Sequence, residues 1–461
     1  MKYTEFGAEE VKIAYVGGGS RGWAWGLMSD LATAKDMSGE VCLYDIDYEA
    51  AKNNEIIGNK FNSAEGATAK WSYKACKTIG EALSGSQFVV ISILPGTFDE
   101  MESDVHTPEK YGIYQPVGDS TGPGGVIRAL RTMPMMEEIA LAIKEYCPDA
   151  WVINYTNPMA LCVKALYDAF PEIKAFGCCH EVFSTQKLMC DALEELRGVR
   201  PADRSEVHVN VIGVNHFTWL NEAKYRDIDV MPVYAEYAEK YKDGIGERDA
   251  NWLNKFFSCQ QMVKFDLFRR YGVAAAAGDR HLAEFCPGDW YLKNPEQVEA
   301  WGFGLTPVSW RKENLQKRLD RSERLRTGAE EVKIDNTGEE GVLQMRAILG
   351  LSDLVTNVNL PNRGQIPNLP LGAVVETNAA FTADSVKPVF AGPVPQGVLA
   401  HVLRNVDNQL LVAEAAKTKK LAPAFRAFVN DPLTRISTDD AKKLFDEMID
   451  NTKKYLTMYD L

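Results

Sequence analysis

Hydrophobic residues follow two alternating patterns along the first part of the chain. Short β-branched runs predict buried strands at residues 11–16, 40–45, 87–94 and 150–154. Between them, apolar residues at helical spacing predict helices over 25–34, 48–61 and 125–146. Pro134 should kink or restart the last of these helices. Strands that alternate with helices indicate a parallel sheet with right-handed crossovers.

The pattern changes after a charged stretch at residues 194–206. We therefore predict two domains, an N-terminal doubly wound α/β domain of residues 1–196 and a C-terminal α+β domain of residues 197–461. In the second domain the expected strands or extended segments are 207–214 and 374–390, and the expected helical regions are 233–271 and 398–428. No internal repeat or low-complexity segment interrupts it.

A glycine-rich motif lies between the first predicted strand and the first predicted helix. Residues 17–22 read Gly-Gly-Gly-Ser-Arg-Gly and fit G-x-G-x-x-G. Gly17 suits the tight turn, Gly19 lets the backbone and the adjacent Ser20 approach a pyrophosphate, and Gly22 permits close packing of helix on strand. A glycine-rich turn without a ligand is the alternative, but the order of strand, motif and helix favours a dinucleotide site.

An acidic residue ends the second predicted strand, where a dinucleotide fold needs one. Asp45 follows Gly22 by 23 residues and can bind a ribose 2′-hydroxyl. Its carboxylate would repel a 2′-phosphate, so we expect NAD rather than NADP, although Arg21 or Lys52 could compensate. Leu94, in the segment 92–96 after the third strand, is expected on the nicotinamide side.

Two further segments carry metal-ligating residue types. Residues 177–182 read Gly-Cys-Cys-His-Glu-Val, and residues 213–217 read Gly-Val-Asn-His-Phe. Thiolate and imidazole both bind transition metals, and two protein ligands leave positions open for substrate oxygens. Asn157, in the Thr-Asn-Pro segment after the fourth strand, can bind a sugar or hydroxy-acid oxygen, or can simply form a turn that caps a helix.

Composition excludes several classes of protein. The formal net charge is −13 over 461 residues, which gives no footprint for a nucleic acid. The nine cysteines are scattered, with only one adjacent pair, so we expect reduced thiols and a cytoplasmic protein. No signal peptide or membrane span is expected, because no apolar run approaches about 20 residues.

Taken in order, these motifs resemble glycoside hydrolase family 4, and so do residues 362–370 and 375–376. The resemblance implies a lactate/malate dehydrogenase-like Rossmann domain, NAD, and a divalent metal, commonly Mn²⁺, held by Cys179 and His216. It also implies a small saccharide substrate and a homodimer or homotetramer.

The motif that begins at the metal-binding cysteine differs between branches of this family. Residues 179–182 read Cys-His-Glu-Val, which resembles the α-galacturonidase branch. The resemblance therefore implies hydrolysis of α-linked uronic acids. An α-glucuronidase or an α-galactosidase of the same family remains an alternative, because one residue of the four carries the distinction.

By the same resemblance, the sugar is oxidised at C3 by NAD, deprotonated at C2 and cleaved by elimination, with the metal acting as a Lewis acid. His180 occupies the position of the acid in other branches, where that acid is an aspartate. The base is predicted to be Asp279 or His281, with Tyr271 as a fallback, and the alternative for Asp279 is a surface ion pair with Arg280.

A uronate carries a carboxylate that a guanidinium can bind through two parallel hydrogen bonds. The candidates are Arg128, Arg131 and Arg280, each of which could instead lie on a solvated helix face. Two other functions stay open at this point. A 2-hydroxy-acid dehydrogenase would use the same fold, although the catalytic histidine segment of that class is not found, and an NAD-sensing regulatory protein would need no metal.

Overall fold

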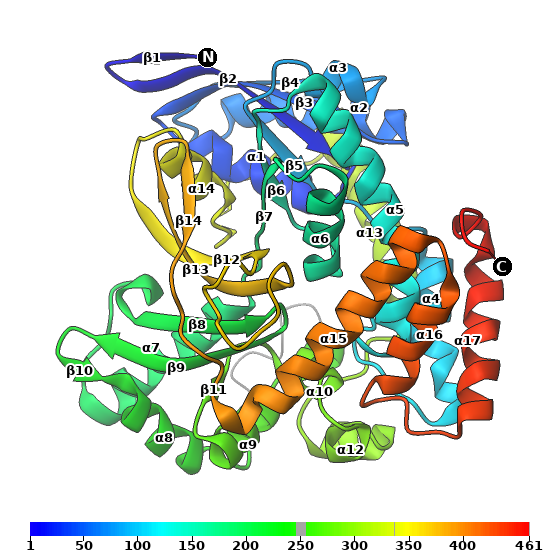
Figure 1. The fold of residues 1–461 in the computed structure, drawn as a ribbon. Coiled ribbons are helices and arrows are strands. Elements are labelled where there is room, and N and C mark those ends of the chain that lie inside the picture. Colours follow the sequence, from blue (N-terminus) through cyan, green and yellow to red (C-terminus); the bar gives the residue numbers. More distant parts are fainter. Residues whose placement is uncertain (246–254, 336, 461) are drawn as a thin grey trace.

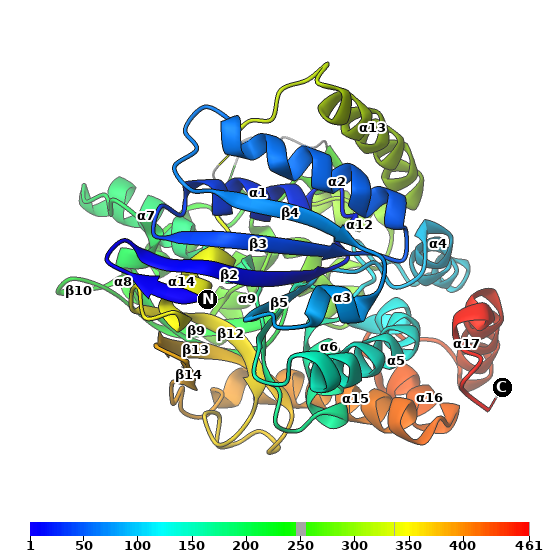
Figure 2. The ribbon, with the colours of Figure 1, turned by 90° about the horizontal axis from the view of Figure 1, so that it is seen from above.

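The computed structural model describes residues 1–245, 255–335 and 337–460. One mixed sheet runs through the molecule, with helices on both of its faces in the N-terminal part (Figures 1 and 2). Its strands are β1 (Lys2–Thr4), β2 (Gly7–Val16), β3 (Met37–Tyr44), β4 (Trp71–Cys76), β5 (Phe88–Ile91), β6 (Trp151–Asn154), β7 (Lys174–Gly177), β8 (His208–Val214), β9 (Phe217–Tyr225), β10 (Ile228–Asp229), β11 (Ala274–Ala275), β12 (Leu354–Pro361), β13 (Val374–Thr382) and β14 (Ser385–Pro388).

The helices cover the two faces of this sheet and its lower end. They are α1 (Trp23–Thr33), α2 (Tyr48–Lys60), α3 (Ile79–Leu83), α4 (Phe98–His106), α5 (Gly122–Tyr146), α6 (Met159–Ala169), α7 (Glu181–Arg197), α8 (Val230–Lys240), α9 (Met262–Tyr271), α10 (Asp279–Glu284), α11 (Gly288–Tyr291), α12 (Pro295–Ala300), α13 (Val308–Thr327), α14 (Gly341–Ile348), α15 (Gln396–Thr418), α16 (Leu421–Asn430) and α17 (Thr438–Thr452).

The N-terminal strands are parallel and lie in the order β4-β3-β2-β5-β6-β7, which is the doubly wound order of dinucleotide-binding folds. Alternate residues of β2 enter opposite cores: Ile13 and Tyr15 pack on one face, and Ala14 and Val16 on the other. Both faces are buried, which explains the continuous apolar runs of the sequence. The predicted α/β class is confirmed.

Two features of this domain differ from the sequence predictions. Strands β1, β4 and β7 and helices α3, α4, α6 and α7 are absent from the predicted set. Helix α5 also runs through Pro134 as one element, so the predicted restart does not occur. Proline has no N–H to donate to the carbonyl four residues earlier, which is that of Leu130. The hydroxyl of Tyr459 donates to this carbonyl instead, at 2.7 Å.

The C-terminal strands extend the same sheet in antiparallel fashion. Strand β12 pairs with β7 through Asn359 and Gly177, and β13, β8, β9 and β10 follow outward. The helical region predicted over 233–271 appears as α8 and α9, with residues 246–254 of it outside the described residues. The predicted domain boundary after residue 196 falls at the end of α7 and stays a prediction.

All nine cysteines lie in the described ranges and are free thiols. Among the helices that the structure describes, none has the length and apolar character needed to cross a membrane.

Candidate functional site

The glycine motif forms the turn between β2 and α1 at the carboxyl edge of the parallel strands. Gly17 has φ +94°, and a Cβ atom there would lie 2.0 Å from the carbonyl oxygen of Ser92. Only glycine fits such a position. Ser20 closes the turn, its N–H donating to the carbonyl of Gly17 at 3.0 Å, and Gly22 directly precedes α1. This is the backbone cradle that a pyrophosphate requires.

Asp45 and a second residue, Asn54, fix this turn from the side. The backbone N–H of Gly19 donates to Asp45 Oδ2 at 2.9 Å. The fully buried Asn54 amide donates to the carbonyl oxygens of Gly18 and Ser20, at 2.8 and 3.0 Å. The structure therefore places Asp45 at the end of β3 beside the motif, where the sequence predicts a ribose ligand. Asn54 was not predicted, because a single asparagine in a helix gives no signal.

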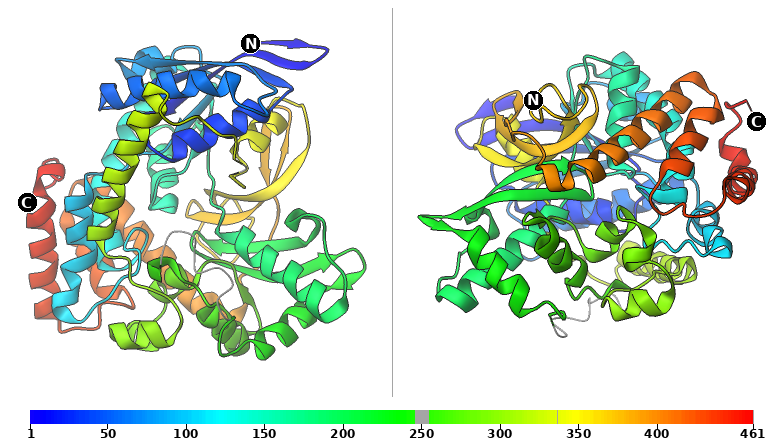
Figure 3. Two further views of the ribbon diagram at one scale, coloured as in Figure 1. Left: turned by 180° about the vertical axis from the view of Figure 1, so that it is seen from behind. Right: turned by 60° about the horizontal axis from the view of Figure 1, so that its bottom comes forward.

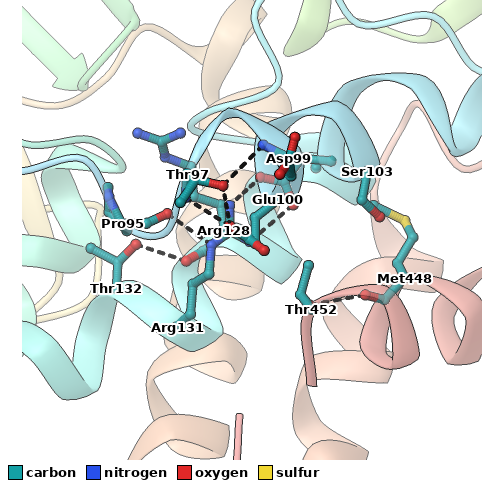
Figure 4. A network of polar contacts seen from close by, with 12 residues as sticks. Pro95, Thr97, Asp99, Glu100, Ser103, Arg128, Arg131, Thr132, Met448 and Thr452 are labelled. Carbon is teal, nitrogen blue, oxygen red and sulfur yellow. Dashed lines mark hydrogen bonds and ion pairs between the residues drawn. The ribbon is translucent and has the colours of Figure 1, made fainter. Parts of the chain in front are cut away.

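Leu94 lies in the loop after β5, and its side chain is exposed. A buried polar network supports this loop (Figure 4). Arg131 donates from Nε to the carbonyl of Pro95 at 3.0 Å and forms a two-point, fully buried ion pair with Asp104. Thr97 and Glu100 form a capping box at the start of α4. The guanidinium of Arg131, one of the three carboxylate candidates, is thus engaged in structural contacts.

A largely buried cluster, with His216 buried and Asp119 and His281 partly exposed, forms where four distant segments meet. Asp119, His216 and His281 each offer one ligand atom, and these atoms lie within 4.8 Å of one another. The two imidazoles stack with ring centroids 3.9 Å apart. Glu181, from the first turn of α7, approaches His281 Nδ1 at 3.4 Å. Nitrogen and carboxylate ligands of this kind suit a divalent transition metal.

His216 owes its position to a hairpin. Val214 pairs with Phe217, so Asn215 and His216 form the two-residue turn between β8 and β9, and His216 has φ 65°. Two-residue hairpin turns commonly need positive φ, which histidine, asparagine and aspartate adopt more readily than most side chains. His216 Nδ1 lies 3.0 Å from Ser120 Oγ, which donates to Asp119 Oδ1 at 2.7 Å. This chain of hydrogen bonds leaves the other ring nitrogen, Nε2, available as a ligand.

The protonation states follow from burial and from these neighbours. Burial and the adjacent His281 lower the pKa of His216 to about 3, so its imidazole is neutral. Burial opposes the charge of Asp119, but the two histidines and Arg128 outweigh it and lower its pKa to about 2. Glu181 raises the pKa of His281 despite burial. The centre therefore combines a neutral ligand, a carboxylate and a basic histidine.

Cys179 is buried near this centre but is not a member of the three-residue cluster. Burial, followed by the carboxylates of Glu376 and Glu181, raises its pKa well above the usual range. The amide of Asn357 donates to the Cys179 carbonyl at 3.0 Å and to Glu376 at 2.7 Å. A nearby cation would reverse the shift and favour the thiolate. Its role as a metal ligand stays a prediction.

His180 lies between the glycine motif and the cluster. Its ring centroid is 6.3 Å from that of Trp23, at the start of α1, and Nδ1 is 2.8 Å from Glu339 Oε1. Desolvation works against the charged ring, but the ion pair outweighs it and raises the pKa of His180 to about 9. The half-exposed His180 is thus protonated at neutral pH, as a general acid must be.

The candidates for the base are separated by the fold. His281 joins the cluster, whereas Asp279 Oδ1 accepts from the backbone N–H of Lys264 at 3.1 Å, in the first turn of α9. Burial raises the pKa of Asp279 to about 6. Tyr271 lies at the other end of α9, its hydroxyl 3.0 Å from His401 Nε2. The geometry therefore favours His281 over both.

Asn157 links Arg128, another predicted residue, to Asp119 of the centre. Its amide donates to Asp119 Oδ2 at 3.2 Å, and its carbonyl accepts from Arg128 Nε at 3.2 Å. Arg280 donates to the carbonyl of Pro116 at 2.7 Å and to Thr306 Oγ1. Asp119 itself was not predicted, because it stands alone in a loop. Its only signal is its position directly before the Ser-Thr-Gly-Pro-Gly-Gly turn at residues 120–125.

Fold and site together define a Rossmann-type enzyme with a buried donor set for a metal beside its nucleotide turn. Residues 12–195 match the sequence model of family 4 glycosyl hydrolases, and residues 211–434 match that of the C-terminal domain of the same family. The chain belongs to this family and is a glycosidase. The resemblance predicted from the motifs is confirmed.

Relatives of the chain align over nearly its whole length. The alpha-galacturonidase of Thermoanaerobacterium saccharolyticum is 61% identical over 99% of this chain and 98% of that protein. The alpha-galacturonidase of Bacillus subtilis is 50% identical over 96% and 97%. The crystal structure of the Bacillus subtilis protein lplD superposes with a TM-score of 0.91 at 50% identity, covering 95% of this chain and all of that chain.

A more distant structure shares the fold. The 6-phospho-beta glucosidase of Thermotoga maritima, solved with manganese, NAD⁺ and glucose-6-phosphate, gives a TM-score of 0.76 at 20% identity over 96% of this chain and 99% of that chain.

Proposed function

We propose that this glycosidase is an α-galacturonidase that depends on NAD and a divalent metal, Mn²⁺ by expectation. The observation that carries the proposal is identity of 50–61% over 96–99% of the chain to four proteins named alpha-galacturonidase. The Cys-His-Glu-Val sequence at 179–182 supports the same branch. The alternative of an α-galactosidase is weaker, since a relative of that name is 29% identical. An α-glucuronidase remains the alternative within the uronide class.

The nucleotide turn fits NAD. Gly17 cannot carry a side chain without meeting the carbonyl of Ser92, so the turn keeps an open backbone face for a pyrophosphate. Asp45 accepts from the N–H groups of Gly19 and Asp47 and keeps lone pairs for the ribose hydroxyls, and Leu94, exposed in the loop after β5, is assigned to the nicotinamide side. When bound there, NAD would supply a hydride acceptor for the sugar C3.

The buried centre fits a divalent metal. His216 Nε2 is the ligand atom left free by the hydrogen-bond chain through Ser120 to Asp119, and Cys179 is the second predicted ligand. A metal held there would polarise the oxygens on C2 and C3 of the sugar. Asn157, anchored on Asp119, is assigned to bind a sugar hydroxyl.

The proton transfers are assigned to two histidines. His281 is assigned to the base rather than to the metal, so its Nε2 removes the C2 proton while Glu181 beside Nδ1 stabilises the imidazolium. His180, charged through its ion pair with Glu339, donates a proton to the leaving oxygen. Asp279 fits this scheme less well, because its carboxylate faces the first turn of α9.

The test is release of p-nitrophenol from its α-galacturonide, α-glucuronide and α-galactoside, with NAD, Mn²⁺ and a reductant that keeps Cys179 reduced. We expect the galacturonide to react fastest and the reaction to stop on chelation. In D₂O, deuterium should appear at C2 of the released sugar. A protonated C2 in all product, or faster cleavage of the galactoside, contradicts the proposal.

The division into domains at residues 196 and 197 and the homodimer or homotetramer also remain proposals. Limited proteolysis tests the first, and sedimentation tests the second.

A further inference from the structure

The charges of three arginines, Arg128, Arg280 and Arg311, interact with that of Asp119, and the first two are already engaged by described residues. Arg128 is buried and donates from Nε to Asn157. Arg280 donates to the carbonyl of Pro116 and to Thr306. A carboxylate held at two points needs a guanidinium edge with two free N–H groups. Both residues have lost part of that capacity to the protein itself.

The third is Arg311, in the first turn of α13, and it was not predicted. Its neighbour Trp310 packs on Phe257 with ring centroids 5.1 Å apart, and the guanidinium of Arg280 lies 4.6 Å from the same Phe257 ring. Arg311 is half-buried. Over the ranges 1–245, 255–335 and 337–460, no hydrogen bond or ion pair engages its guanidinium.

The charges around Arg311 also favour the binding of an anion there. Burial, and then the positive charge of Arg280, lower its pKa to about 10, with Arg128 adding to the effect and Asp119 opposing it. An ordinary surface arginine has neither this desolvation nor these neighbours. A half-buried guanidinium with its donors free, beside two other guanidinium groups, is a place where an anion is stabilised.

Helix α13 connects the surroundings of Arg311 to the nucleotide turn. It runs up the back of the molecule as the yellow-green helix of Figure 3, from the lower helices to α2. Arg318 lies seven residues after Arg311, hence on the same helix face and about 10 Å further along. Its Nη1 donates to the carbonyl of Arg21 at 3.1 Å, at the end of the glycine motif. The face of α13 that carries Arg311 therefore faces the region between the nucleotide turn and the buried centre.

We propose that Arg311 binds the C6 carboxylate of the uronide and so determines the preference for an acidic over a neutral sugar. The inference rests on the proposed function, since it needs a uronic acid as substrate. Arg280 and Arg128 add positive charge without supplying the two-point contact. Recognition of the substrate carboxylate would then come from α13 rather than from the arginines of α5 and α10.

The experiment compares Arg311→Gln, Arg311→Lys and a matched control, Lys317→Gln, which removes an exposed charge from the same helix. We expect Arg311→Gln to lower kcat/KM for the α-galacturonide about 100-fold relative to the α-galactoside. Lysine should restore part of the loss, since it keeps the charge but not the planar fork. Lys317→Gln should leave the ratio of the two substrates unchanged.

Binding gives a readout that does not depend on turnover. By calorimetry, Arg311→Gln should lose affinity for free galacturonate but not for galactose, and its NADH fluorescence should match that of the wild type. If the wild type itself prefers the galactoside, the proposed function fails and this inference fails with it. If the wild type prefers galacturonide but Arg311→Gln keeps the same preference, or loses both substrates equally, only the inference is overturned. If Arg311→Gln does not fold, the ratio of kcat/KM for the two substrates in Arg311→Lys tests the inference instead.

Discussion

The nucleotide turn and the buried histidine centre are built in opposite ways. The turn is one continuous segment, residues 17–22, and it acts through backbone geometry. The centre collects side chains from the loop before α5, the first turn of α7, the β8–β9 hairpin and α10. The nucleotide turn needs only β2 and α1 to be placed correctly, whereas the centre needs four separate segments to be placed correctly.

This difference determines how each region tolerates change. A backbone site depends on the absence of side chains, so adding a methyl group damages it. A side-chain site depends on charge and on hydrogen bonds, so an isosteric change can silence it without disturbing the fold. The two regions should therefore fail separately, one in cofactor binding and the other in turnover.

The largest effect is expected at His281. His281→Gln removes the basic ring beside Glu181 and should lower kcat by about 10²–10⁴-fold with NAD affinity unchanged. The matched control is Asp279→Asn on the same helix, which faces α9 and should cost stability rather than turnover. Steady-state kinetics and fluorescence titration with NADH measure both. A larger loss of kcat in Asp279→Asn would reassign the base.

A smaller effect is expected at Gly17, and it should appear in cofactor binding rather than in turnover. Gly17→Ala places a Cβ 2.0 Å from the Ser92 carbonyl at φ +94°, so NAD should bind about 100-fold more weakly. Gly198→Ala is the control, because Gly198 also has positive φ but has no atom within 4 Å of its would-be Cβ. Calorimetry with NAD on both variants separates the effect of backbone strain alone from the effect of the clash in the glycine turn. Equal losses in both variants would contradict a specific role for the turn.

The next effect in size is expected at Asp45, in the binding of NAD. Asp45→Ser removes the acceptor at the end of β3, and we expect about 10-fold weaker NAD binding together with stronger NADP binding. The change of preference follows because the repulsion of a 2′-phosphate disappears. Titration with both cofactors measures it, and an unchanged ratio would show that Asp45 only supports Gly19.

The same contrast explains what could be predicted from the sequence. The glycine motif and Asp45 carry local signals, so their placement beside β2 and β3 follows from order along the chain. Asp119 and Arg311 are single polar residues in a loop and in a charged helix, and only the tertiary fold brings them to the centre. The continuation of the sheet from β7 to β12 rests on one residue pair, Gly177 with Asn359, separated by 182 positions.

The smallest effect is expected from Glu284, which supports the centre from a distance. Its buried carboxylate accepts from the N–H groups of Val117 and Gly118 at 2.6 and 3.0 Å and so holds the loop that ends in Asp119. Burial raises its pKa to about 7, above the ordinary 4.5.

The folded state therefore binds this proton more tightly than the unfolded chain does, and the stability it contributes below about pH 4.5 is lost as the pH rises through about 7. Glu284→Gln keeps the acceptor without the charge, so its thermal midpoint should fall less than that of the wild type between about pH 5 and about pH 8. Melting curves at one scan rate measure the difference. Parallel slopes would mean that the carboxylate stays ionised, held by the two N–H groups, and that the loop before Asp119 is anchored by charge.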